Sequence, residues 1–150
     1  MAKLSVDVIT AERVVFSDTD IDAVVAPGAV GELTVLPEHA SLITSLVPGE
    51  VRIQKAGADE TYMVVTGGFL EVRDDKVIIL AENAEKADEI DVARAQAARE
   101  RAERSLGSRE AAVDLSRVQA ELRRSLIRLK VADRRRRRGG PGGLSGPNPP

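Results

Sequence analysis

The chain has 150 residues, of which 43% are hydrophobic and 31% charged, enough apolar material for a core that needs no disulfides. It contains no cysteine, which excludes disulfide frameworks and thiolate metal sites, and no apolar run approaches the roughly 18 residues of a membrane-spanning helix. Residues 1–85 carry 15 acidic and 6 basic residues, whereas residues 86–150 carry 9 acidic and 16 basic ones. This asymmetry indicates an acidic domain followed by a basic arm.

The first 86 residues predict an all-β domain. Apolar and polar residues alternate in Leu4–Val8, which is typical of a half-buried strand. Further short runs of β-forming residues lie at 13–16, 21–26, 33–36, 42–47, 51–53, 61–66, 69–72 and 77–80. Turn signals such as Pro27-Gly28 and Gly67-Gly68 separate these runs, and residues 73–76 join the last two as a hairpin. We therefore expect a β-sandwich or barrel.

From residue 87 the apolar spacing becomes helical. Asp88 is expected to cap a first helix, with Asp91 three residues later completing a capping-box-like pair. The helix should run to Leu106, and a stripe of small residues is expected along it: Ala93, Ala97, Ala98 and Ala102. Gly107 and Ser108 then predict the end of this helix and the cap of the next one.

The second helix carries one narrow apolar stripe. Its members recur at steps of 3, 4, 4 and 3 and are Leu115, Val118, Leu122, Leu126 and Leu129. Together the two helices predict an αα-hairpin over residues 87–133. Alanines bury little area, and burial stabilises by roughly 25 cal/mol per Å², so we expect an arm that can leave its docking site. Residues 134–150, five arginines followed by a Gly/Pro-rich stretch, predict a disordered tail.

Catalytic and metal-binding patterns are missing from the sequence. The single histidine, His39, has no cysteine to pair with, and no G-x-S-x-G motif accompanies the nearby serines. One histidine among scattered carboxylates does not supply a metal site. Residues 36–40 are more typical of a structured turn in which the imidazole bonds to backbone, and we do not expect an enzyme.

Nucleotide binding has one candidate region. No phosphate-binding glycine motif occurs, but Arg94 and Arg101 lie seven residues apart, on one helix face and about 10 Å apart along the axis. Two guanidinium groups at this spacing could hold a polyphosphate. The spacing by itself favours the plainer alternative, an exposed ion pair between Asp91 and Arg94.

Two further basic features remain open at this point. The run Arg134–Arg138 attracts polyanions, yet it lacks interleaved aromatic residues, and a solvated tail is the plainer interpretation. The second helix surrounds its apolar stripe with basic residues, which suits docking onto an acidic partner: Arg117, Arg123, Arg124, Arg128 and Lys130. A membrane-surface helix would normally carry Trp or Phe on its apolar face, and this one does not.

The order of several motifs resembles one family. Gly31-Glu32-Leu33 leads into Leu36-Pro37-Glu38-His39-Ala40, then come Pro48-Gly49, Gly67 to Val72, and finally Ile90-Asp91-Val92-Ala93-Arg94-Ala95. The last hexapeptide is similar to the family's ATP-binding signature, Ile/Leu-Asp-x-x-Arg-Ala. Over about residues 3–132 the chain resembles the epsilon subunit of bacterial F-type ATP synthase.

The resemblance implies a ten-stranded flattened β-barrel or sandwich followed by an antiparallel helical hairpin. It also implies a non-catalytic central-stalk rotor subunit at the cytoplasmic face of the plasma membrane, coupling proton transport to ATP synthesis. The β-domain would contact the gamma subunit and the c-ring, with Glu32 and His39 in the c-ring-facing loop. The helices would inhibit ATP hydrolysis when extended, and basic residues would then meet acidic segments of the beta subunits: Arg117, Arg123, Arg124 and Arg128.

The resemblance further implies a regulatory ATP that holds the hairpin down, and no required cofactor or metal. Carried over residue by residue, its ligands would be Glu85, Asp91, Arg94 and Arg101. The arginine run and the Gly/Pro tail depart from the usual family ending. The alternative function is a polyanion- or nucleic-acid-binding module that uses this tail.

Overall fold

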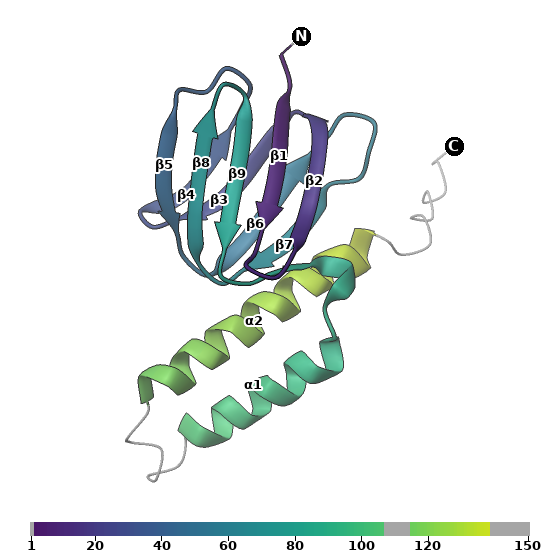
Figure 1. The fold of residues 1–150 in the computed structure, drawn as a ribbon. Helices are drawn as coiled ribbons and strands as arrows, with labels where there is room; N and C mark the ends of the chain where they lie inside the picture. Colours follow the sequence, from purple (N-terminus) through teal and green to yellow (C-terminus); the bar gives the residue numbers. More distant parts are fainter. Residues whose placement is uncertain (1, 107–114, 139–150) are drawn as a thin grey trace, which may run out of the picture.

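The computed structural model describes residues 2–106 and 115–138, and the predicted boundary at Gly107 and Ser108 lies outside this part. A β-domain is followed by two helices that lie side by side beneath it (Figure 1). The strands are β1 (Leu4–Ile9), β2 (Val14–Ile21), β3 (Ala23–Gly28), β4 (Gly31–Val35), β5 (Leu42–Leu46), β6 (Gly49–Gln54), β7 (Thr61–Val65), β8 (Gly68–Arg73), β9 (Lys76–Ala81) and β10 (Ala84–Lys86). A 3₁₀ turn η1 (Ala87–Glu89) leads to α1 (Val92–Leu106), and α2 is Leu115–Arg138.

Within the described residues the ten strands form one sheet, as the family resemblance implies. The hydrogen-bonded order is β10-β7-β6-β3-β5-β8-β9-β1-β2, with β4 paired to β3 beside this path. The pairs are antiparallel except for β1 with β9, which run parallel. Because β2 and β10 at the two ends of the order also contact each other, the sheet curls into a nearly closed barrel.

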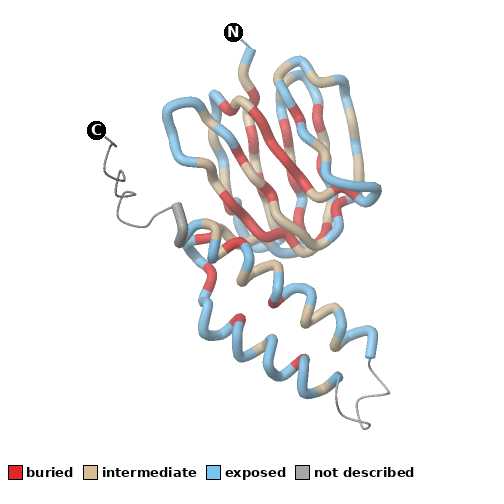
Figure 2. Tube along the Cα trace, turned by 180° about the vertical axis from the view of Figure 1, so that it is seen from behind, coloured by how far each residue is buried: buried red, intermediate tan, exposed pale blue. Residues whose placement is uncertain are grey.

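The main core lies inside this barrel. Burial alternates along β1, where Leu4, Val6 and Val8 point inward and the residues between them are half-buried. Figure 2 shows the buried positions concentrated along the strands, while the helices are mostly exposed. The core is aliphatic, with Ile21, Ile53, Met63, Leu70 and Ile79 among its largest fully buried side chains. Among the described residues it is built from strand residues only, so the β-domain, the platform of the molecule, has an interior without the helices.

Two turns explain local features of the sequence. The predicted hairpin between β8 and β9 is confirmed, and its central residues Asp74 and Asp75 have φ of 47° and 59°, the left-handed conformation of a tight type I′ turn. Gly68 has φ of 132°, and an added Cβ there would lie 2.0 Å from the Leu80 carbonyl oxygen. Gly68 therefore allows the close approach of β8 and β9.

The first helix differs in two details from the one expected from the sequence. The cap of α1 is Asp91 rather than Asp88, because the Arg94 amide donates to Asp91 Oδ1 at 3.0 Å. The residues before it form η1 instead, so the helix starts one turn later than expected. The buried alanines are Ala95 and Ala102, with Ala98 half-buried between them, whereas the predicted Ala93 and Ala97 are exposed. The helix is rotated relative to the expected stripe.

The second helix also differs from its expected form. It continues through Arg134 to Arg138, five residues that the sequence assigns to a disordered tail. Of the expected stripe, Leu115 and Leu126 are exposed, while its other three members are half-buried. The positions that are buried instead are Ser125 and Val131, because α2 is packed between α1 and the β-domain.

A second, smaller cluster attaches α2 to the barrel. Val131 is fully buried among Tyr62, Val64, Ala87 and Ile90. Half-buried Ile127, one turn before Val131, packs against the same cluster, as does Ala132. The C-terminal half of α2 is thus docked on β7 and η1, and the hairpin lies folded against the platform.

Candidate functional site

A groove with a volume of ≈ 490 Å³ lies where the helices meet the sheet. It is bounded by β7 and β10 on one side and by both helices on the other, with Ala98 as the contribution of α1. Its polar lining consists of Thr66, Asn83, Glu85, Arg117, Glu121, Arg124, Ser125 and Arg128. Cavities of about this size bind small molecules in many proteins, and three arginines make this one suited to an anion.

A bidentate ion pair bridges the groove from sheet to helix. Arg128 Nε and Nη2 donate to the two carboxylate oxygens of Glu85, each at 2.8 Å. Both side chains are about three-quarters buried, with exposed fractions of 24% and 29%. The pair brings one predicted nucleotide ligand, Glu85, together with one predicted partner-binding residue, Arg128.

The other three predicted nucleotide ligands lie on or before α1. The Asp91 carboxylate is occupied as the helix cap, and Asp91 makes no ion pair with Arg94, contrary to the plainer interpretation of their spacing. Arg94 and Arg101 are exposed, and neither makes a side-chain hydrogen bond or ion pair within the described residues. Neither lines the groove, although both share a helical stripe with Ala98, which does.

The predicted partner-binding arginines divide between the groove and the outer surface. Arg117 and Arg124 are exposed and line the groove, whereas Arg123 is exposed and does not. Arg128 is the only one of the four that is paired within the described residues. The structure thus gathers three of them around one cavity. Their steps of seven and four residues place them on one helix face, but the sequence did not show the cavity beside that face.

The remaining two predicted residues lie on the platform. Glu32, on β4, accepts a hydrogen bond from Arg52 Nη2 at 3.0 Å, and its side chain is 64% exposed. The His39 ring is half-buried and donates from Nδ1 to the Ala40 carbonyl at 2.7 Å, which confirms the predicted backbone contact. Asp75 Oδ1 accepts from the Glu38 amide at 2.6 Å and helps to fix this loop.

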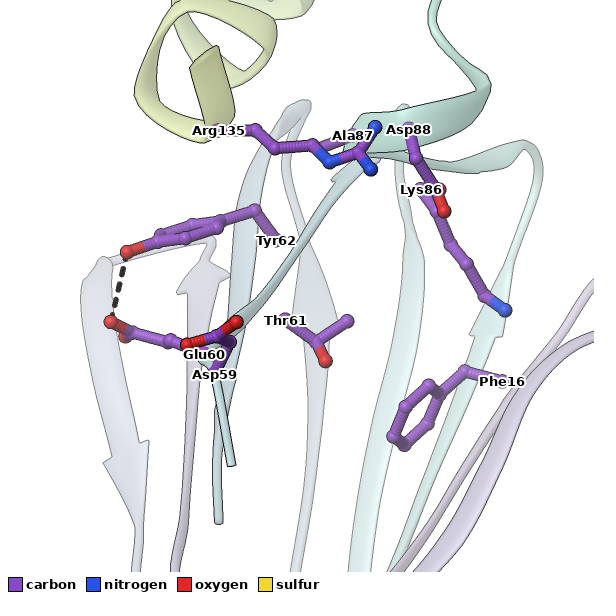
Figure 3. Close-up of a pocket in the computed structure, with 9 residues that line it drawn as sticks. All are labelled: Phe16, Asp59, Glu60, Thr61, Tyr62, Lys86, Ala87, Asp88 and Arg135. Atoms are coloured by element: carbon purple, nitrogen blue, oxygen red, sulfur yellow. Dashed lines mark hydrogen bonds between the residues drawn. The ribbon is translucent and has the colours of Figure 1, made fainter. Parts of the chain in front are cut away.

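A second hollow of ≈ 430 Å³ lies beside the end of α2 (Figure 3). Arg135 of α2 lines the hollow close to η1, and the β7 residue Tyr62 lines it as well. The Tyr62 hydroxyl donates to Glu60 Oε2 at 2.9 Å. The lining carries both signs of charge, with Asp59, Glu60 and Asp88 against Lys86 and Arg135, so it favours no ligand class.

An ion pair fixes η1 to the β-domain at the seam, the junction at residues 86–89 between the β-domain and the helices. Arg13 donates from Nη2 and Nη1 to Glu89 at 2.9 and 3.3 Å. This hydrogen bonding, with the accompanying charge attraction, holds the pKa of Glu89 below its ordinary value of 4.5. The same carboxylate accepts a hydrogen bond from the Lys86 amide, so Glu89 is bound both to Arg13 and to the end of β10.

Sequence reasoning missed an apolar surface on the barrel exterior. Phe69 and Leu80 are directly paired across β8 and β9, and both side chains are more than half exposed. Ile43 on β5, which is 73% exposed, lies diagonal to Phe69 on the same face. These residues alternate with core residues along their strands, so the pattern placed them outside but could not show that they meet.

Other site classes find no support in the described part of the chain. Residues 2–106 and 115–138 contain no group of three or more His, Asp or Glu side chains that could hold a metal ion. No helix of this part is long and apolar enough to cross a membrane.

Comparisons with known proteins cover both parts of the chain. The family model "ATP synthase, Delta/Epsilon chain, beta-sandwich domain" matches residues 3–87, and "ATP synthase, Delta/Epsilon chain, long alpha-helix domain" matches residues 88–133. The ATP synthase epsilon chain of Dehalococcoides mccartyi is 51% identical over 138 residues, or 91% of this chain and 97% of that one. That of Desulforamulus reducens is 47% identical over 89% of this chain and all of its own length.

A solved structure gives the same fold. A chain in the cryo-EM structure of the mitochondrial ATP synthase of Euglena gracilis, containing OSCP, F1 and c-ring, is similar with a TM-score of 0.70. The match covers 89% of this chain and 81% of that chain at 23% identity, so it supports the fold alone.

Proposed function

The chain belongs to the family of ATP synthase delta/epsilon chains, and on that premise we propose that it works as the epsilon subunit of a proton-transporting ATP synthase. It is a non-catalytic component of the central-stalk rotor, which couples ion translocation to ATP synthesis. The observation that carries the proposal is that the family models account for residues 3–133 without a gap. As part of this complex it is attached peripherally at the cytoplasmic face of the bacterial plasma membrane.

The exposed apolar face of the barrel is the proposed site for the gamma subunit. Phe69, Leu80 and Ile43 are exposed on one face of the sheet, and exposed apolar patches mark protein interfaces. A permanent rotor contact requires an apolar core of this kind with a polar rim. Glu71, opposite Ile43 in the register, belongs to that rim.

The c-ring contact is assigned to the segment from Gly31 to His39, which the structure shows to be strand β4 and the turn after it rather than a single loop. Glu32 is exposed and charged, and Arg52 holds its side chain in a defined place. His39 contributes through the shape of the loop, because its Nδ1 is bound to backbone. A charged and ordered edge of this kind suits contact with the polar loops of the ring's subunits.

The hairpin is the proposed regulatory element. In the folded-down state Arg128 is neutralised by Glu85, while Arg117, Arg123 and Arg124 are exposed. When the hairpin extends, all four become available to acidic segments of the beta subunits, and ATP hydrolysis is inhibited. A ligand that binds only the folded-down state shifts this equilibrium by its differential affinity.

ATP is the proposed ligand of the groove between hairpin and sheet. Arg94 and Arg101 are free to turn toward phosphates, and Arg124 and Arg117 already line the cavity. Glu85 belongs to the groove wall, and Asp91 fixes the start of α1 and therefore the position of Arg94. Because the groove has walls from the sheet and from both helices, a ligand in it would hold the hairpin down.

Calorimetric titration of the full chain with ATP tests the regulatory site. We expect a single saturable site whose affinity falls at least tenfold in R94A and in R101A. The matched control is R99A, since Arg99 lies on the same helix but is paired to Glu103 away from the groove. No binding at millimolar ATP, or equal losses in R94A and R99A, would remove the sensor role.

Reconstitution tests the subunit role as a whole. The full chain should be captured by a purified gamma subunit, and F69S/L80S should lose this capture while keeping its fold by circular dichroism. A chain truncated after Ala87 should still bind gamma but should no longer restrain ATP hydrolysis by the assembled complex. The proposal would be contradicted if F69S/L80S were still captured by gamma, or if the truncation left ATP hydrolysis unchanged.

A further inference from the structure

Two carboxylates flank an apolar residue in one row across the sheet. In the register, Glu85 on β10 and Glu50 on β6 are both directly opposite Val64 on the strand between them, β7. Directly opposed residues share a face of the sheet, and neighbouring strands are about 4.8 Å apart. The two carboxylate-bearing residues are therefore separated by about 10 Å, with Val64 midway.

A complementary row lies on α2. Arg128, Val131 and Arg134 follow one another at intervals of three residues, which places the two arginines about 9 Å apart along the helix axis. Arg128 binds Glu85, Val131 packs in the cluster with Val64, and Arg134 Nη1 donates to Glu50 Oε1 at 2.5 Å. Each residue of one row thus contacts its counterpart in the other. Figure 1 shows this end of α2 running obliquely beneath β6 and β7.

We propose that the row Glu85–Val64–Glu50 is a built docking site for the C-terminal end of α2, and that the Glu50–Arg134 pair is a clasp that holds the hairpin down without nucleotide. The site recognises a helix that presents cation, aliphatic residue and cation at three-residue steps. In this way the first arginine of the run 134–138 is part of the arm's attachment.

A residue of the β-domain, Arg52, helps to position Glu50 for this contact. Arg52 Nε lies 3.5 Å from Glu50 Oε1, and Arg52 also binds Glu32, so both its partners belong to the β-domain. With α2 docked, the Glu50 side chain is only 12% exposed, and its Oε2 is buried and accepts no hydrogen bond within the described residues. A carboxylate this deeply placed is stabilised by a second guanidinium, which Arg134 supplies only when α2 is docked.

The clasp lies outside the nucleotide groove. Glu85 and Arg128 line that groove, whereas Glu50 and Arg134 do not. A ligand that takes Arg128 for its phosphates therefore leaves the Arg134 end intact. By linkage, loss of the clasp lowers the folded-down population, and the apparent nucleotide affinity falls by the same factor. This last consequence rests on the proposed function, while the clasp does not.

Hydrogen exchange of the full chain without nucleotide tests the clasp. In R134Q and E50Q we expect amides of residues 120–133 to exchange about three- to tenfold faster, the range for a partly exposed charged hydrogen bond. The double variant E50Q/R134Q should be no faster than the quicker single variant. The matched control R123Q, at an exposed position of the same helix, should exchange like the unaltered chain.

Protection of β1 and β9 in the same experiment shows that each variant keeps the barrel fold. Unchanged exchange in R134Q, equal acceleration in R123Q, or additive effects in the double variant would each overturn the clasp. If the chain binds no ATP at all, the exchange result still decides the clasp, so failure of the nucleotide role and failure of the clasp are distinguishable.

Discussion

Single glycines decide where strands of this barrel can approach each other. At Gly68 the backbone has positive φ, and any Cβ would overlap the Leu80 carbonyl and the Ala81 Cα. At Gly57, in the loop after β6, φ is also positive at 77°, but nothing lies within 4 Å of an added Cβ. A comparison of substitutions at the two positions therefore separates the cost of backbone strain from the cost of steric overlap.

G68A should destabilise the chain by about 2–4 kcal/mol, because strain and overlap with backbone atoms add, whereas G57A should cost only about 1 kcal/mol. Urea unfolding followed by circular dichroism measures both. Equal losses at the two positions would mean that the close approach of β8 and β9 does not matter.

Charge pairs at the seam give a pH dependence of defined sign. The pKa of Glu89 is lowered in the folded chain by its hydrogen bonds and attraction to Arg13. A lowered carboxylate pKa contributes stability that is present above the unfolded value of 4.5 and is lost as pH falls through the lower folded value.

The free energy of unfolding should therefore fall more steeply for the unaltered chain than for R13A as the pH falls below the unfolded value of 4.5, because R13A loses the largest cause of the lowered pKa of Glu89. Urea titrations at several pH values measure the two slopes. The pairs Lys55–Asp18 and Lys3–Asp22 also lower carboxylate pKa values and are intact in both chains, so they cancel from the comparison. Parallel slopes would contradict the assignment.

At the scale of elements, the hairpin depends on which alanines face α2. Ala95 and Ala102 are buried at the contact, which lets the two helices approach closely but buries little area. Ala97 lies on the exposed side of the same helix. The arm is therefore held as much by its docking on the sheet as by its internal packing.

A95L should force the helices apart and accelerate hydrogen exchange of both, with a cost of about 1–3 kcal/mol from overpacking. A97L adds the same side chain on the solvent side and should leave exchange unchanged. Should A97L instead be the disruptive variant, the helix would be rotated toward the stripe expected from the sequence.

At the scale of the whole molecule, a complete β-core carries a separately attached arm. Within residues 2–106 and 115–135, whose side chains are described, the interior cluster contains no residue of either helix, while the smaller cluster includes Val131 of α2. Removing the arm exposes Tyr62 and Val64 without opening the barrel. Attachment by a few contacts on a stable platform is consistent with the movement proposed for the arm.

A chain truncated after Ala87 should thus fold by itself and unfold in one cooperative urea transition, with a midpoint below that of the full chain. The lower midpoint follows from lost burial of Tyr62 and Val64, at roughly 25 cal/mol per Å². Circular dichroism and urea titration measure this. A truncated chain without a cooperative transition would show that the platform depends on the arm.

The sequence alone determined the strand pattern, the change to helix after residue 87 and the backbone role of His39, because alternation, turn residues and helical spacing are local signals. It could not fix the helix cap, since Asp88 and Asp91 are chemically equal candidates and only the packing of η1 selects the second. Nor could it show that Arg134 continues the helix. A run of arginines is typical of a solvated tail, and the sequence does not reveal that the Glu50 carboxylate lies opposite Arg134. That placement came from the register, which sets Glu85 and Glu50 on either side of Val64, residues far apart in the chain. Contacts between distant segments depend on how the strands pair in three dimensions, which local sequence signals do not specify.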